Sequence, residues 1–316
     1  MTTIRSRPRP HPLAVQRGFT LVEAIVAMVI TALIAGTMVL FINRPVRNYV
    51  DSAGRAEMTD VADLALRRMA RELRASLPNS ARVTSTADGA VYLEFIPTSG
   101  GGRYLSVDDD AATGTPLSFT DASAQSFTVV GNLPAAAIRS GRQDYIAIYN
   151  LGSGFQAADA YTGGNLARVT SFSAPTLFYT RLPAADLGGG NAVASTLNPY
   201  AAPAQQSPPQ LPNSSPDQRF QVVGKPVIFR CLGNAGATGT LTRSVAPTFS
   251  AVPSTPAASA GVLLANNVVA CDFPIATNAN RQSSLVTLTL ALGRAGPDGG
   301  IETVTLTHQI HVNNMP

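Results

Sequence analysis

Glu23 is the residue whose type and position most need a chemical explanation. It is the only charged residue among the 24 residues from Phe19 to Ile42, an apolar segment that Arg17 precedes and Arg44 follows. As a helix this segment would be about 36 Å long, which is enough to cross a hydrocarbon core of about 30 Å. A charge at the bilayer centre costs roughly 2.5–3.5 kcal/mol on insertion scales, and less toward the interface. Glu23 is therefore a candidate functional residue, with a helix-entry carboxylate stabilised by the helix dipole as the simpler alternative.

The two cysteines of the chain, Cys231 and Cys271, lie far beyond this segment. If the arginine-rich end of the segment faces the cytoplasm, both cysteines lie outside it, where disulfides form and persist. A bridge would close a loop of about 41 residues and stabilise the fold by roughly 4 kcal/mol in the chain-entropy model. We expect this disulfide, with two unpaired buried thiols as the alternative.

His308 and His311 are the candidate metal ligands, and Asp108–Asp110 is the candidate calcium loop. Residues three apart on a strand point to opposite faces, so the two histidines cannot share one ion. The acidic run lacks the spaced oxygens and the bidentate acid of a calcium loop, so we expect a solvated loop. The chain has three histidines, no Gly-x-Ser-x-Gly elbow and no phosphate-binding lysine motif, so we expect no enzyme, catalytic residue, cofactor or metal.

The positive charge of the chain is concentrated at its N-terminus. Residues 1–18 contain Arg5, Arg7, Arg9 and Arg17 and no acid; without these four, 19 basic residues balance 19 acidic ones. The rest of the chain therefore has no basic footprint for nucleic acid, and the arginines fit the cytoplasmic flank of a membrane helix. A cleaved secretory signal is the alternative, but its apolar region is usually shorter and ends at an A-x-A site.

The apolar segment is followed by an amphipathic pattern, predicted to continue the helix over residues 45–78. Pro45 marks a possible kink or unwound turn at the junction, and Pro78 with Asn79 ends the helix. Asp63 with Arg67 and Arg68 with Glu72 are spaced as i,i+4 ion pairs. The apolar stripe, which we expect to pack on the domain that follows, consists of Leu66, Met69, Leu73 and Leu77.

After Pro78 the sequence changes to short β-type runs between clusters of Gly, Pro, Ser and Asn. The clearest are residues 285–293 and 301–312, a predicted hairpin in which Val286, Leu288, Leu290 and Leu292 share one face. The Pro-rich segment 201–218 reads as an exposed loop or a linker between two β-rich lobes. We therefore predict an α+β fold, a long N-terminal helix packed on antiparallel sheet. Further strands are expected at residues 90–97, 126–130, 145–151 and 226–232.

The stretch RGFTLVEAIVAMVI, residues 17–30, resembles the N-terminal signature of type IV prepilins and type II secretion pseudopilins. The glycine, phenylalanine and glutamate stand at the spacing of that signature, ahead of a long apolar helix. The resemblance implies cleavage between Gly18 and Phe19 by a prepilin peptidase, and N-methylation of Phe19. It also implies that Glu23 neutralises the N-terminal amine of a neighbouring subunit during assembly. Two charges that are each costly in lipid become tolerable as such a pair.

The resemblance further implies a prepilin leader at 1–18, a transmembrane and assembly helix at 19–44, and a β-rich periplasmic domain at 79–316. The chain would be anchored in the bacterial inner membrane with a cytoplasmic N-terminus and then join a filament. Its partners would be the prepilin peptidase and methyltransferase, other pilins, the assembly platform and the lipid bilayer.

Three other stretches, residues 67–83, 263–273 and 308–316, resemble MshO-type minor pilins of the mannose-sensitive haemagglutinin (MSHA) pilus. A tip pseudopilin of type II secretion is an alternative. A pilus-tip adhesin that binds through the loops at Gly100–Asp110 and Ala201–Gln218 is another.

Overall fold

The computed structural model describes residues 18–109, 113–133, 137–138, 143–188, 211–277, 282–296 and 299–316. These residues fall into two compact units, one ending at Ala56 and the other running from Glu57 to Pro316, and each is described by itself. Most of the predicted leader, residues 1–17, lies outside the described residues.

The long helix α1 spans Leu21–Arg74. It continues through residue 45, so the unwound turn considered at Pro45 is not observed. A proline in a helix interior removes one hydrogen bond, whereas an interruption would leave several donors and acceptors unpaired at two new helix ends. The side chains at residues 40 and 42–47 are not described.

In the second unit, the end of α1 buries one face against a sheet. Leu66, Met69 and Leu73 are fully buried there, as the apolar stripe predicts. Leu77 is also buried, but it lies beyond the helix in another cluster, because α1 ends at Arg74. The Leu77 amide donates to Ile96 O, just after β2 (Val91–Phe95), at 2.7 Å. It therefore does not make the bond to a preceding carbonyl that another helical turn would need.

Both predicted ion pairs of the helix are present. Arg67 Nε lies 2.6 Å from Asp63 Oδ2, and Arg68 Nε lies 3.3 Å from Glu72 Oε1. Glu72 also accepts from Arg243 Nε of the sheet at 2.8 Å, so the second pair ties the helix to the sheet as well.

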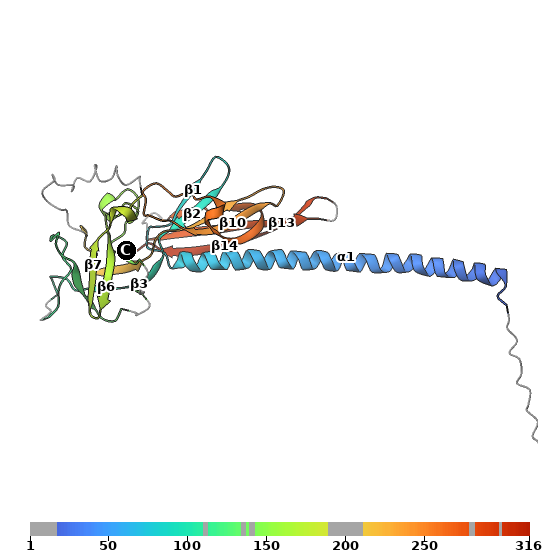
Figure 1. Cartoon of the computed structure of the whole chain (residues 1–316), viewed down its shortest axis with the longest axis horizontal. Coiled ribbons are helices and arrows are strands. Elements are labelled where there is room, and N and C mark those ends of the chain that lie inside the picture. Colours follow the sequence, from blue (N-terminus) through green and yellow to red (C-terminus); the bar gives the residue numbers. More distant parts are fainter. Residues whose placement is uncertain are drawn as a thin grey trace, which may run out of the picture. The chain divides into compact units, whose positions relative to one another are not determined.

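The sheet contains eight antiparallel strands in the order β1-β2-β9-β10-β11-β13-β12, with β14 on the other side of β13 (Figure 1). The predicted hairpin is confirmed: β13 and β14 pair residue for residue from Ser283↔Asn313 to Ala295↔Ile301. The strands are β1 (Arg82–Ser85), β2 (Val91–Phe95), β9 (Val227–Leu232), β10 (Gly239–Val245), β11 (Val262–Asp272), β12 (Ile275–Thr277), β13 (Ser283–Ala295) and β14 (Ile301–Asn313).

A closed barrel is inserted into this sheet between β2 and β9. Its strands follow one another around the barrel as β3-β4-β7-β6-β5-β8, and β8 pairs again with β3. The interior is filled by aromatic and aliphatic side chains, including Phe127, Tyr179 and Phe220. The strands are β3 (Thr98–Tyr104), β4 (Ser126–Val130), β5 (Tyr145–Ala147), β6 (Leu166–Ser173), β7 (Thr176–Arg181) and β8 (Arg219–Val223).

The Pro-rich segment differs from its prediction where it can be described. Residues 201–210 lie outside the described residues, and Leu211 and Ser215 are buried instead of exposed. Leu211 packs into the barrel interior, and the Ser215 amide donates to the Tyr104 hydroxyl at 3.0 Å. The strands on either side, β7 and β8, belong to the same barrel, so this segment does not link two lobes.

The turn after α1 joins the barrel to the sheet. The Asn79 side-chain amide donates to the carbonyl oxygens of Asn150 and Asn314, both at 2.9 Å. The Asn150 side chain in turn donates to Pro78 O at 2.6 Å. Gly152 lies flat against this turn at φ +81°, and a Cβ there would come 2.6 Å from Asn79 O. The described residues contain one α-helix, three short 3-10 helices (Gln156–Ala158, Ala184–Asp186 and Ala258–Ala260) and predominantly antiparallel sheet, which agrees with the α+β prediction only coarsely.

Candidate membrane-anchor and assembly site

The start of α1 is capped by Thr20. The Glu23 amide donates to Thr20 Oγ1 at 3.2 Å, and the Ala24 amide donates to Thr20 O at 3.2 Å. Thr20 and Glu23 have the S/T-x-x-E spacing of a capping box, in which a first-turn glutamate also favours the helix N-terminus. The spacing is present in the sequence and could have identified Thr20 as the cap, a role that was not predicted above.

Glu23 lies in the first turn of α1 and is exposed. Within the residues that the structure describes, no hydrogen bond or ion pair involves its carboxylate, while its amide is held by Thr20. Gly18 and Phe19 precede the helix, and the Phe19 side chain is 76% exposed. The predicted cleavage, methylation and assembly residues therefore lie within six consecutive positions around one helix start. Their roles are predictions that the geometry leaves open.

The first part of α1 is long and apolar enough to cross a membrane. The span from Leu21 to Val39 has a mean hydropathy of 2.2, and none of its side chains is buried. Nineteen residues of helix rise about 28 Å, close to the thickness of a hydrocarbon core. Apolar side chains are exposed along its whole length, from Leu21 to Phe41.

The hydroxyl groups of this span are satisfied inside the helix. Thr31 Oγ1 donates to Ala27 O at 2.7 Å, and Thr37 Oγ1 donates to Ile34 O at 2.9 Å. In lipid a polar group without a partner costs several kcal/mol, so such bonds are what an apolar solvent requires. Glu23 differs from the two threonines because its charge has no such partner in the described residues.

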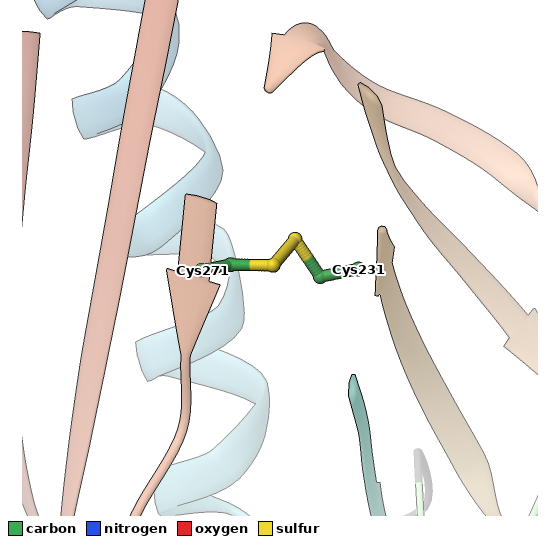
Figure 2. The surroundings of a disulfide bond; sticks show 2 residues. All are labelled: Cys231 and Cys271. Atoms are coloured by element: carbon green, nitrogen blue, oxygen red, sulfur yellow. A yellow bond between two sulfur atoms is a disulfide. The ribbon is translucent and has the colours of Figure 1, made fainter. Parts of the chain in front are cut away.

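The predicted disulfide is confirmed. Cys231 on β9 and Cys271 on β11 are bonded, with 6.4 Å between their Cα atoms (Figure 2). Both sulfur-bearing residues belong to the apolar layer between the sheet and α1, where Cys231 is fully buried. The bond therefore cross-links two strands in the core of the second unit.

Two of the histidine and aspartate candidates, His308 and Asp109, have structural partners. His308 and His311 lie on opposite faces of β14, and His308 Nε2 lies 3.5 Å from Asp63 Oδ1 of α1. Asp109 accepts from Arg103 Nη2 at 2.6 Å and from the Ser106 amide at 2.8 Å. Asp110 lies outside the described residues. No group of three or more His, Cys, Asp or Glu side chains at metal-binding spacing occurs within the described ranges.

Glu94 is the most buried carboxylate of the sheet. Its Oε2 accepts from Arg82 Nη2 at 2.8 Å and from the Ser254 amide at 3.1 Å. Burial raises the pKa of Glu94 although Arg82 lowers it. Arg82 also donates to the carbonyl oxygens of Ser250 and Ala251. Arg82 and Glu94 therefore hold residues 250–254 on the sheet, and the bonds described here join groups of this chain to one another.

The outer wall of the barrel has a shallow hollow of about 520 Å³ between β3 and β8. Its floor is the backbone of Gly100–Gly102, and its sides include Arg103, Arg219 and Gln221. Arg103 is paired with Asp109, and Arg219 Nη2 lies 3.5 Å from Asp217 Oδ2, so the positive charges are balanced. The hollow lies at one of the two loops expected for an adhesin.

Comparison with protein families gives one match, to the prokaryotic N-terminal methylation motif, over residues 13–39. The match covers the predicted cleavage site and the apolar part of α1 and supports a type IV pilin-like or pseudopilin protein. Comparisons with curated proteins and with solved structures found no match. The motif and the apolar helix together fit a single-pass, membrane-anchored protein that a prepilin peptidase processes and that assembles as pilins do.

Proposed function

We propose that this chain is a minor pilin-like subunit of an MSHA-type type IV pilus, of the MshO kind, with a structural role in pilus assembly or initiation. The observation that carries the proposal is the methylation motif at residues 13–39, followed along α1 by the span Leu21–Val39, in which no side chain is buried. Such an apolar span needs lipid before assembly and the helices of other subunits afterwards. We propose no catalytic activity, because the candidate polar clusters serve the fold.

In this proposal, cleavage after Gly18 leaves a charged amine at Phe19, just before the start of α1. A positive charge is unfavourable at a helix N-terminus, where the dipole is itself positive. A carboxylate is favourable there, and Glu23 is exposed with no side-chain partner in the described residues. An ion pair between the amine of one subunit and Glu23 of the next would neutralise two charges that lipid solvates poorly.

Cleavage is tested by mass spectrometry of the N-terminus of the membrane-extracted protein, where methylated Phe19 is expected. Gly18→Val should block processing. A steric clash within the chain would not explain this result, since nothing lies within 4 Å of a Cβ at Gly18. Gly36→Ala is the matched control, because Gly36 is equally open and should leave processing unchanged. A chain that begins at Phe19 in the Gly18 variant, or a cut near Gly36, would contradict the proposal.

The role of Glu23 is tested by separating its charge from its place in the capping box. Glu23→Gln removes the charge but keeps a residue that suits the third helical position. We expect this variant to insert in the membrane and to be poorly incorporated into filaments, whereas Thr20→Ala, which removes the cap, should assemble nearly as the wild type. Normal incorporation of Glu23→Gln would show that the charge is not the assembly contact.

The type of filament is decided by which machinery the full-length chain accompanies. Co-purification with MSHA-type pilus components is expected, and co-purification with type II secretion components would favour the tip pseudopilin. The hollow over Gly100–Gly102 supports a binding role as a second candidate. Loss of surface binding on Gly101→Trp, with unchanged piliation, would support that candidate.

A further inference from the structure

The strand β14 forms a long open edge of the sheet. It spans Ile301–Asn313, and all its residues pair with β13 on one side without a register shift. No other strand of the described structure pairs with it. On its far side every second residue therefore directs a main-chain N–H and C=O away from the sheet, and the backbone bonds of the described residues include none that satisfies them there.

This edge lacks the features that usually protect an edge strand. Natural sheets shorten such strands or use Pro, Lys or bulges to prevent pairing with other chains. The opposite edge of the sheet follows this rule, because β1 has only four residues, and β12, which pairs with β13 beyond the end of β11, has only three. The barrel is closed and has no edge. β14 has 13 residues, contains no Pro or Lys, and has β-forming residues at most positions.

We propose that the outer edge of β14 accepts an extended segment of another protein chain, which adds to the sheet as a further strand. The chemistry identifies the occupant as a peptide, since donors and acceptors that alternate along an extended backbone are complementary to another extended backbone. The exposed face of β14 carries Thr303, Thr305 and Thr307, which favour cross-strand contacts with β-branched neighbours.

A second copy of this chain is the other conceivable source of a strand. Two identical edges would pair antiparallel about a two-fold axis perpendicular to β14. The end of α1 runs beside β14 in the second unit, where Asp63 contacts His308 (Figure 1). The axis would reverse the direction of this helical segment between the copies, whereas subunits anchored in one membrane enter in the same direction. The inference that the added strand comes from a different protein, and not from a second copy, thus rests on the proposed function. The inference that the edge of β14 is open does not.

Hydrogen exchange of the full chain in detergent tests the open edge. Alternate amides of β14 should exchange fast, and those between them, which donate to β13, should be protected. The probe is a synthetic eleven-residue peptide of alternating Thr and Val with a Lys at each end. It should slow the fast amides by about tenfold or more and leave the others unchanged. The control peptide is N-methylated at two adjacent central residues, which blocks both of its edges, and it should have no effect.

Three results would overturn the proposal. The first is uniform protection of β14 in the protein alone, because the edge would then be covered. The second is equal slowing by the two peptides. The third is slowing that grows with protein concentration without any peptide, because the partner would then be a second copy. None of these results depends on processing at Gly18, so failure of the open edge and failure of the pilin assignment can be told apart.

A proline variant adds a test within the chain. Of the neighbouring positions Thr305 and Leu306, the exchange pattern identifies the one whose amide faces outward. At Thr305, which is exposed, proline would remove only the free donor, so β13 pairing should persist and the response to the peptide should be lost; at Leu306 it would also remove a side chain that packs on the core. Proline at the other position disrupts pairing with β13 and marks the level of damage to the fold. An undiminished peptide response in the outward variant would also contradict the proposal.

Discussion

The disulfide between Cys231 and Cys271 gives the sharpest stability prediction. The bond joins residues 40 apart in the sequence. A cross-link that closes a loop of this size lowers the entropy of the unfolded chain enough to stabilise the fold by about 4 kcal/mol at 25 °C. Reduction of the bond, or the double substitution Cys231→Ala and Cys271→Ala, should therefore lower the free energy of unfolding of the second unit by about this amount.

The assay is urea unfolding of the compact unit 57–316, followed by far-UV circular dichroism. With a slope of about 3 kcal/mol per molar urea, a loss of 4 kcal/mol moves the midpoint down by roughly 1–1.5 M. The reduced wild type serves as the control for the double variant, since it lacks the cross-link but keeps both sulfur atoms in the core. A larger loss in the double variant than in the reduced protein measures the packing of the sulfur atoms.

The reasoning is refuted if the reduced protein unfolds within about 1 kcal/mol of the oxidised one. The unfolded state would then be as compact without the bond as with it. A loss confined to the double variant would show that the cysteines act by packing alone.

Three other comparisons test the fold, each measured by urea unfolding of the same unit. Leu66→Ala, in the fully buried face of α1, should lower the free energy of unfolding by about 3–4 kcal/mol. Leu64→Ala, at a residue 72% exposed on the same helix, should lower it by under about 0.5 kcal/mol. Equal losses would contradict the assigned helix face. Gly152→Ala should cost more than Gly89→Ala, because both glycines have positive φ but only a Cβ at Gly152 meets backbone; the reverse order would contradict the close approach. Burial raises the pKa of Glu94 in the folded protein. Its contribution to the free energy of unfolding is therefore fully present below the unfolded pKa and is lost as the pH rises through the folded pKa. The stability of the wild type relative to Glu94→Gln should fall with rising pH, and parallel pH profiles of the two proteins would contradict this.

Local patterns were sufficient to predict the helix, the hairpin and the disulfide. The stripe of Leu66, Met69 and Leu73 follows the helical period, and the alternation from Val286 to Leu292 follows the strand period. Each pattern is contained in a short stretch of sequence, so it can be read without knowledge of the partner element. The disulfide needed only the compartment and the count of cysteines.

The barrel could not be predicted from such patterns. Its closure depends on pairing between β3 and β8, which are far apart in the sequence. β3 contains Gly100–Gly102, and glycine weakens a strand, so this segment does not read as one. Glycine suits all three positions, because a Cβ at Gly100 would come 2.6 Å from Ala137 and one at Gly101 or Gly102 would come 3.0 Å from Phe220. Leu211 was assigned to an exposed loop because its neighbours are Pro, Gln and Ser.

At the N-terminus, the helix start and the apolar span could be predicted from the sequence, but the partner of Glu23 could not. The position of Glu23 at a helix start follows from the sequence and is observed, and the apolar span follows from hydropathy. In the proposed function the partner of Glu23 belongs to another molecule, which no single chain contains. That part of the site therefore requires experiments on assembled filaments.

The insertion of the barrel between β2 and β9 also affects how the chain reaches its fold. Phe95 and Val227 are paired neighbours in the sheet, and Thr98 and Val223, at the two ends of the barrel, are paired with each other. Closing an unfolded loop of roughly 130 residues costs about 3 kcal/mol more than closing one of about five residues. A barrel that folds first brings its two ends together and removes most of this cost. The sheet could then form as if β2 and β9 were joined by a short turn.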